Sequence, residues 1–297
     1  MNKTQPQQRI NLKNILFPTD FSPAAEWAVP FVRKIAQEFD ADVTTLHVAV
    51  PDVLRYMTPD SPKAAIELQQ AWALGEIKKV ETQLPGIRNH IVVRTGPDVW
   101  TVAKSLIQAE QIGLIILGTH GLTGLPKLLM GSTAEEIFRR SPVPVITIGP
   151  SARTDEETGA PWQHVIFASD FTAESRAAAP YAISFAEENN AQLTLVHVIG
   201  TRGSHEEERY VGGSVAEAMH QLDQIVPPAA ELWCRPETVV EHGDPATRIL
   251  AVAREKAADL IVLGIRNTSH VIVASREKSI AHTIVAHASC PVLTVRN

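Results

Sequence analysis

The chain of 297 residues contains an internal duplication, in which the second half repeats the pattern of the first, and this duplication limits the folds that it can adopt. The clearest matches are NILFPTDFS at 14–22 with HVIFASDFT at 164–172, and VTTLHV at 43–48 with LTLVHV at 193–198. The offset is 150 residues in these segments and 146 residues between Gly118 and Gly264, so small insertions and deletions lie in loops. A repeat of this length indicates two copies of one structural unit.

Each copy alternates short apolar runs with helical patterns, which is typical of β-α-β units on a mostly parallel sheet. In the first copy we expect strands at 14–17, 43–50, 87–94, 113–117 and 144–148. We expect Ser22 to cap a helix that has Pro23 at its first position. With right-handed crossovers, the pattern predicts an α/β fold of two tandem doubly wound domains, each a five-stranded, mostly parallel sheet flanked by helices.

The two copies are joined by a polar segment at 149–161 whose Ser, Thr, Asp, Glu, Gly and Pro content is typical of a solvated linker. We therefore expect one domain over residues 1–150 and a second over residues 161–297. In the second domain the crossover after the second strand matches poorly, and we expect a loop followed by a helix at about 215–225.

Composition indicates a soluble globular protein, since 44% of the residues are hydrophobic and 20% are charged. A net charge of -6 argues against a general nucleic-acid or membrane-surface binder, because those classes usually carry a basic excess. The two cysteines have no CxxC spacing, which disfavours a disulfide framework or a cysteine-rich zinc site. Without a signal peptide or an apolar run of about 18 residues, a cytoplasmic protein is expected.

The strongest functional signal follows the expected strand at 113–117. Gly118-Thr-His-Gly121 is followed by nine residues and then by Gly131-Ser132. Glycines let the backbone approach an anion, and the N–H groups at the start of a helix bind one. The pattern therefore predicts a phosphate-binding loop.

The second copy lacks this pattern. Gly121 has no glycine counterpart there, and Lys278 stands in the place of Gly131. A side chain where the backbone must touch phosphate is expected to block binding. Arg266, Arg276 and Lys278 can form either a side-chain anion site or a basic solvated loop.

The glycines and the serine of the first copy also have structural explanations. Gly118 and Gly121 can be turn residues that need a positive φ. Ser132 opens a capping box with Glu135, so its hydroxyl can simply satisfy the helix terminus. This second explanation is compatible with phosphate binding, because both use the same N–H groups.

The titratable residues have similar alternatives. Asp20 can bind ribose hydroxyls or an adenine amine, or it can stabilise the dipole of the adjacent helix, as its counterpart Asp170 in the other half suggests. His120 can donate to a phosphate or lie on a loop. His47 and His197 are expected to be hydrogen-bonded sheet histidines. No metal site is predicted; in particular His282 and His287 are five residues apart and do not share a helix face.

The chain resembles the universal stress protein family in its tandem form, over nearly all of residues 11–296. The glycine pattern matches the ATP-binding motif of that family in full. The resemblance implies that Asp20, within Pro18-Thr19-Asp20, contacts the adenosine portion and that Val48 offers a backbone contact to the adenine. It implies that the phosphates are held by Gly118, His120, Gly121, Gly131, Ser132 and Thr133.

The resemblance implies an ATP-binding stress or regulatory protein, with nucleotide, either with or without Mg²⁺, in the N-terminal domain. It also implies pairing of last strands, 143–148 with 292–295, within one chain or in a homodimer. Two alternatives remain open: a weak ATPase or autophosphorylating enzyme that uses Ser132 or Thr133, and a nucleotide-independent interaction module. A dedicated enzyme is not expected, because no P-loop and no nucleophile-elbow sequence is present.

Overall fold

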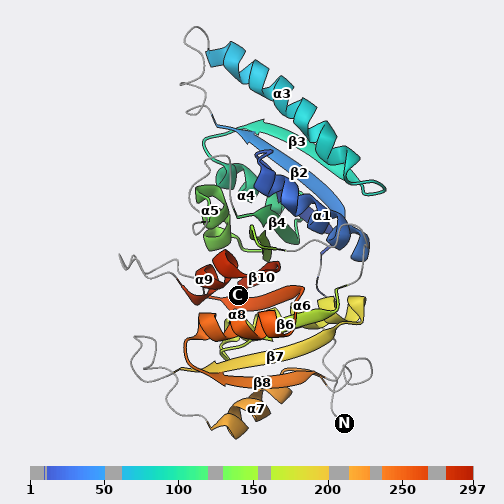
Figure 1. Cartoon of the computed structure of the whole chain (residues 1–297). Coiled ribbons are helices and arrows are strands. Elements are labelled where there is room, and N and C mark those ends of the chain that lie inside the picture. Colours follow the sequence, from blue (N-terminus) through green and yellow to red (C-terminus); the bar gives the residue numbers. More distant parts are fainter. Residues whose placement is uncertain are drawn as a thin grey trace. The chain divides into compact units, whose positions relative to one another are not determined.

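The computed structural model describes residues 10, 12–50, 62–119, 130–152, 162–200, 214–227, 236–266 and 279–296. The chain divides into two compact units, built mainly from residues 11–150 and 160–297 (Figure 1). Within the described segments, no helix is long and apolar enough to cross a membrane.

The N-terminal unit contains a five-stranded sheet in the order β3-β2-β1-β4-β5, in which the neighbouring strands run parallel. Its elements in chain order are β1 (Asn14–Pro18), α1 (Pro23–Glu38), β2 (Asp42–Ala49), α3 (Pro62–Thr82), β3 (Asn89–Thr95), α4 (Val99–Ala109), β4 (Leu114–Gly118), α5 (Ser132–Arg140) and β5 (Val145–Ile148).

The C-terminal unit repeats this arrangement, with the strand order β10-β9-β6-β7-β8 and parallel pairs. Its elements are β6 (His164–Ala168), α6 (Ala173–Asn189), β7 (Gln192–Ile199), α7 (Val215–Asp223), β8 (Glu237–His242), α8 (Pro245–Glu255), β9 (Leu260–Ile265), α9 (Ile280–His287) and β10 (Val292–Arg296). The predicted fold of two doubly wound domains is confirmed.

The strand and helix boundaries follow from local sequence. Ser22 caps α1 as expected: its Oγ accepts from the Ala25 amide at 3.3 Å, and Pro23 is the first helical residue. Its counterpart Thr172 caps α6 in the same way. The expected strand at 87–94 begins and ends slightly later, at Asn89–Thr95.

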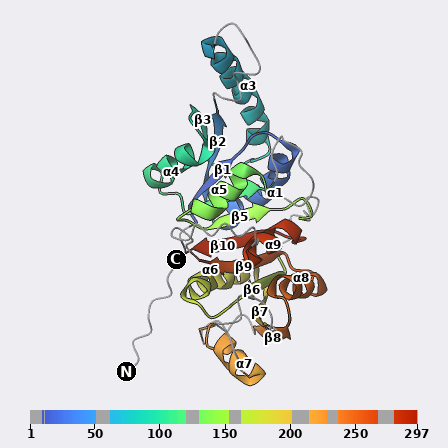
Figure 2. The ribbon, with the colours of Figure 1, turned by 90° about the vertical axis from the view of Figure 1, so that its left-hand side faces the viewer.

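Helices cover both faces of each sheet. In the N-terminal unit α1 contacts β2 and β4 and α3 contacts β2 and β3, while α4 contacts α5 on the opposite face (Figure 2). The central strand β1 is therefore enclosed, and Ile15, Leu16 and Phe17 are fully buried. The strand order reverses between β1 and β4, and between β6 and β9. In doubly wound sheets, ligands bind outside the carboxyl ends of the strands at such a point.

Candidate functional site

The N-terminal switch point brings the end of β4 to the start of α5. The Thr119 amide donates to the carbonyl oxygen of Ile148 at 3.0 Å, and the Gly131 amide donates to the carbonyl oxygen of Thr119 at 2.6 Å. Thr119 is buried. These bonds place Gly118 and Gly131, which are 13 positions apart in the sequence, on the same edge of the sheet.

Gly118 has a packing role that the sequence did not reveal. The glycines with positive φ in the described segments are Gly86 and Gly243, so the alternative explanation of Gly118 as a turn residue with positive φ does not hold. A Cβ at Gly118 would instead clash with the carbonyl oxygen of Ala24, because β4 passes directly against the start of α1. Gly264 meets the start of α6 in the same way. Both domains thus keep this glycine for close packing, whether or not they bind a ligand.

The start of α5 differs from the expected capping box. Gly131 is the N-cap, with φ -60° and ψ 151°, and no side chain caps the helix. Ser132 therefore lies in the first turn, one position inside the expected cap, and Ser132 and Thr133 are both exposed. In α9 the equivalent Ser279 is the N-cap, and its Oγ accepts from the His282 amide at 3.2 Å. The first-turn N–H groups of α5 thus lack the side-chain cap that α9 has.

The loop between β1 and α1 is shaped by its own side chains. Thr19 Oγ1 accepts from the Phe21 amide at 3.1 Å, and Asp20 Oδ1 accepts from the Ser22 amide at 3.0 Å. The Thr19 amide donates to the carbonyl oxygen of Leu46. Asp20 is half-buried. Its carboxylate therefore supports the entry to α1, and the same side chain lies at the switch point.

Val48 lies where β2 continues past the end of β1. The carbonyl of Leu46 points toward β1 and that of Ala49 points toward β3, where it accepts from the Gly96 amide. Because the direction of the peptide groups alternates along a strand, Val48 directs its N–H and C=O to the β1 side, two residues beyond Leu46. The β1 chain has turned away there at Thr19.

His47 and His197 are hydrogen-bonded sheet histidines, as predicted. Nδ1 of His47 lies 3.0 Å from the carbonyl oxygen of Thr19, and Nδ1 of His197 lies 2.8 Å from that of Ser169. Burial lowers the pKa of both imidazoles, so the neutral ring is favoured. Sequence reasoning did not find the partners of these rings, although Asp-Phe and His-Val recur in both halves.

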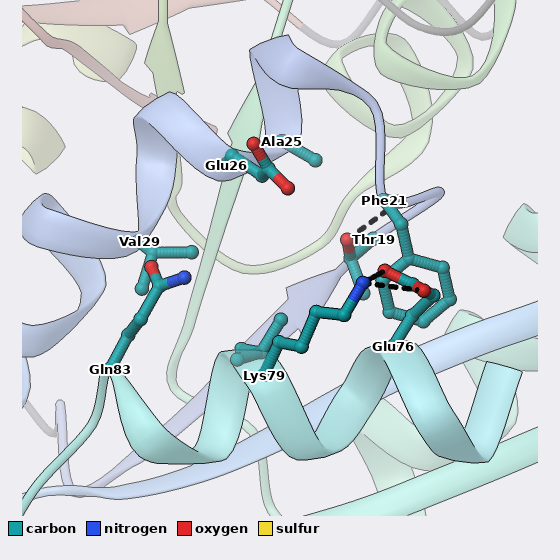
Figure 3. A pocket seen from close by; sticks show the side chains of 9 residues that line it. Thr19, Phe21, Ala25, Glu26, Val29, Glu76, Lys79 and Gln83 are labelled. Atoms are coloured by element: carbon teal, nitrogen blue, oxygen red, sulfur yellow. Dashed lines mark hydrogen bonds and ion pairs between the residues drawn. The ribbon is translucent and has the colours of Figure 1, made fainter.

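A small cavity lies between α1 and α3, beside the β1–α1 loop (Figure 3). It is lined by Thr19, Phe21, Ala25, Glu26, Val29, Glu76, Lys79, Val80 and Gln83. The Lys79 ammonium group donates to both carboxylate oxygens of Glu76 at 2.8 Å. Gly118 and Gly131 are not part of its lining, so within the described part of the chain this cavity is distinct from the expected phosphate site.

Two of the expected site residues, His120 and Gly121, lie outside the described residues, as do Arg276 and Lys278. Within the described part of the chain, no group of three or more His, Cys, Asp or Glu side chains is arranged to hold a metal ion.

The C-terminal switch point has an internal ion pair. Arg266 Nη2, just after β9, lies 3.6 Å from Oδ2 of Asp170, just after β6. Asp170 also accepts from the amide and the hydroxyl of Thr172. Asp170 thus keeps the loop bond that Asp20 also makes and adds a contact to Arg266, and Ser279 caps one N–H group at the start of α9.

The chain is 24% identical over 294 residues to a universal stress protein of Mycolicibacterium smegmatis, covering 95% of this chain and 96% of that protein. It is 28% identical over 149 residues to a universal stress protein of Methanocaldococcus jannaschii, covering 46% of this chain and 81% of the relative.

Among solved structures, a universal stress protein from Archaeoglobus fulgidus superposes with a TM-score of 0.74 at 18% identity, covering 96% of this chain and 98% of the other. That likeness shows the fold. The sequence model of the Universal stress protein family matches residues 11–149 and again residues 161–296. With its two copies of the domain in tandem, the chain belongs to the universal stress protein family.

Proposed function

We propose that the N-terminal domain binds ATP at the carboxyl ends of β1, β2 and β4, and that the chain acts as a nucleotide-responsive stress or regulatory protein. The observation that carries this proposal is the pair of hydrogen bonds through Thr119, which joins the end of β4 to Gly131. Gly131 begins α5, and the start of that helix has no side-chain cap. Members of the family bind nucleotides.

In the proposed complex, the phosphates lie at the start of α5. The backbone N–H groups of Ser132 and Thr133 are proposed to donate to anionic oxygens, with the two exposed hydroxyls as further donors, while the Gly131 N–H holds the start of α5 to Thr119. Gly118 lets β4 reach this edge, and His120 and Gly121 complete the loop in the proposal. A Mg²⁺ ion carried with ATP would offset part of the phosphate charge.

The nucleoside occupies the β1 and β2 side of the same edge. Asp20 is proposed to accept from the ribose hydroxyls, and the adjoining Pro18 and Thr19 form the wall. The Val48 peptide, directed past the end of β1, offers one donor and one acceptor to the adenine edge. This pattern suits a purine with an amine next to a ring nitrogen.

We propose that the C-terminal domain does not bind nucleotide in this mode. Its helix start is capped by Ser279 and its aspartate is paired with Arg266. Nucleotide in the other domain would then act by linkage, favouring the conformation of the chain that binds it. The strands β5 and β10 each end the strand order of their own unit. They are the edges proposed to pair, within the chain or in a homodimer, and native mass spectrometry would count the chains.

The test is to denature the purified protein, identify released nucleotide by mass spectrometry, and compare wild type with Gly131→Lys. Because Gly131 has a φ of -60°, a lysine adds no backbone strain there, and Gly131→Ala controls for loss of the glycine itself. Wild type is expected to carry ATP and to melt at higher temperature with added ATP, whereas Gly131→Lys does neither.

Binding is refuted if wild type carries no nucleotide and added ATP leaves its melting temperature unchanged. Retention of ATP by Gly131→Lys would instead show that the phosphates lie elsewhere. The exposed Ser132 and Thr133 hydroxyls are the feature that favours the enzymatic alternative. ATP turnover or phosphate incorporation no faster than in buffer would eliminate it.

A further inference from the structure

The histidines of the second strands hold the preceding loops by the same contact in both domains. Since a carbonyl oxygen can only accept, Nδ1 of His47 donates to Thr19 and Nδ1 of His197 donates to Ser169. Each imidazole thus ties a strand of the sheet to the loop that follows the neighbouring strand. We call this arrangement the histidine clasp.

The clasp also contains a strained phenylalanine. Phe21 has a φ of 60° and Phe171 a φ of 61°, in the left-handed region that is costly for a bulky side chain. The ring of His47 stacks on Phe21 with centroids 4.8 Å apart and planes at 27°. The corresponding values for His197 and Phe171 are 4.4 Å and 27°. The stack and the hydrogen bond to Thr19 or Ser169 offset this strain, so the loop conformation depends on the histidine.

The N-terminal clasp is reinforced by Trp72 of α3. The indole meets the Phe21 ring edge-on at 5.3 Å and the His47 ring at 6.1 Å. His47 is only 5% exposed, and its Nε2 has no hydrogen-bond partner among the described residues. The ring is therefore held by its Nδ1 bond and by aromatic contacts.

Asp20 lies between the two residues that His47 holds, Thr19 and Phe21. We propose that His47 is a positioning residue for the nucleotide site, which keeps the β1–α1 loop in the conformation that presents Asp20 to the nucleoside. This inference rests on the proposed ATP site. Without the clasp, the loop samples other conformations, and the apparent affinity falls with the fraction of molecules that are competent to bind.

The two domains provide a matched experiment on the full chain. The ATP dissociation constant is measured by titration calorimetry for wild type, His47→Phe, His47→Asn and His197→Phe. His47→Phe keeps a ring for stacking but leaves the Thr19 carbonyl without its donor, and we expect about tenfold weaker binding. His47→Asn retains an amide donor close to the Nδ1 position, and it is expected to recover part of the affinity.

His197→Phe removes the same bond from the other domain. His197→Phe is expected to lower the stability of the protein about as much as His47→Phe does. It is expected to change the ATP affinity by less than about twofold, because the proposed site is in the other domain. Equal effects of His47→Phe and His197→Phe on affinity, or no effect of His47→Phe, would overturn the positioning role.

Hydrogen exchange separates failure of this inference from failure of the proposed site. The amides of Phe21 and Ser22, which bond within the loop, are expected to exchange faster in His47→Phe even without ATP. If wild type binds no ATP but this exchange increases, the proposed function fails and the clasp remains a loop-ordering contact. If the exchange is unchanged, the clasp does not order the loop.

Discussion

Arg266 reaches across the C-terminal switch point to Asp170, with Nη2 3.6 Å from Oδ2. The two residues follow β9 and β6, which are neighbours in the sheet, so the ion pair spans their carboxyl ends. Arg296 Nη1 holds Arg266 in turn by donating to its carbonyl oxygen at 2.9 Å. His120 is the sequence counterpart of Arg266, and Gly149 is that of Arg296. The C-terminal copy therefore crosses this point with two arginines, and neither counterpart position in the N-terminal copy is an arginine.

The first prediction is that Asp170→Ala destabilises the protein more than Arg266→Ala does. Both side chains of the ion pair are about half exposed, so its loss is expected to cost less than about 1 kcal/mol. Asp170 additionally accepts from Thr172, the cap of α6, and losing that support is expected to cost about 1 kcal/mol more. Urea unfolding measures both. A larger loss for Arg266→Ala would show that the ion pair is the stronger support.

Much of the fold was predictable because the duplication doubled each weak signal. The strand runs and the Ser22 cap are local, and their counterparts at 164–168 and Thr172 repeat them. Close packing between segments that are distant in the sequence leaves no such local signal. The clash that forbids a side chain at Gly118 comes from Ala24, which is 94 positions away in the sequence. The left-handed Phe21 is similarly stabilised by a ring from another strand, so neither feature has a pattern within its own segment.

The second prediction concerns the glycines at the ends of β4 and β9. Gly118→Ala and Gly264→Ala are each expected to destabilise the protein by about 1–3 kcal/mol, because the added Cβ meets helix backbone that cannot move aside. Thermal and urea unfolding test this, with Gly75→Ala as a control whose Cβ would meet nothing within 4 Å. If Gly118→Ala lost ATP binding at full stability, the packing explanation would be wrong.

The third prediction separates the two helix starts. Ser279→Ala removes the side-chain cap of α9 and is expected to cost about 1 kcal/mol, whereas Ser132→Ala removes no cap from α5 and should cost only a few tenths. Stability is measured by urea unfolding without nucleotide. Ser132→Ala is expected to weaken ATP binding, and Ser279→Ala is not. Equal stability losses would indicate that Ser132 also acts as a cap.

The fourth prediction is a loss of stability in mild acid, to which the two clasp histidines and His164 contribute, because burial lowers the pKa of all three. Burial lowers the pKa of His47 and His197 below their unfolded value of about 6.5, although the hydrogen bonds to the Thr19 and Ser169 carbonyls, and then the charges of Asp20 and Asp170, partly oppose this. The unfolded chain therefore binds more protons between the lowered pKa and about pH 6.5, so stability is full above about pH 6.5, falls as the pH decreases from there to the lowered folded pKa, and levels off below it. Urea unfolding at intervals between about pH 7.5 and 5 measures the slope of the free energy of unfolding against pH.

The double variant His47→Asn, His197→Asn is the control: it is expected to be less stable at neutral pH and to show a flatter slope. Asp98, whose pKa is lowered by hydrogen bonds from Thr101, titrates below this range and does not obscure it. An unchanged slope in the double variant would mean that other groups cause the acid sensitivity.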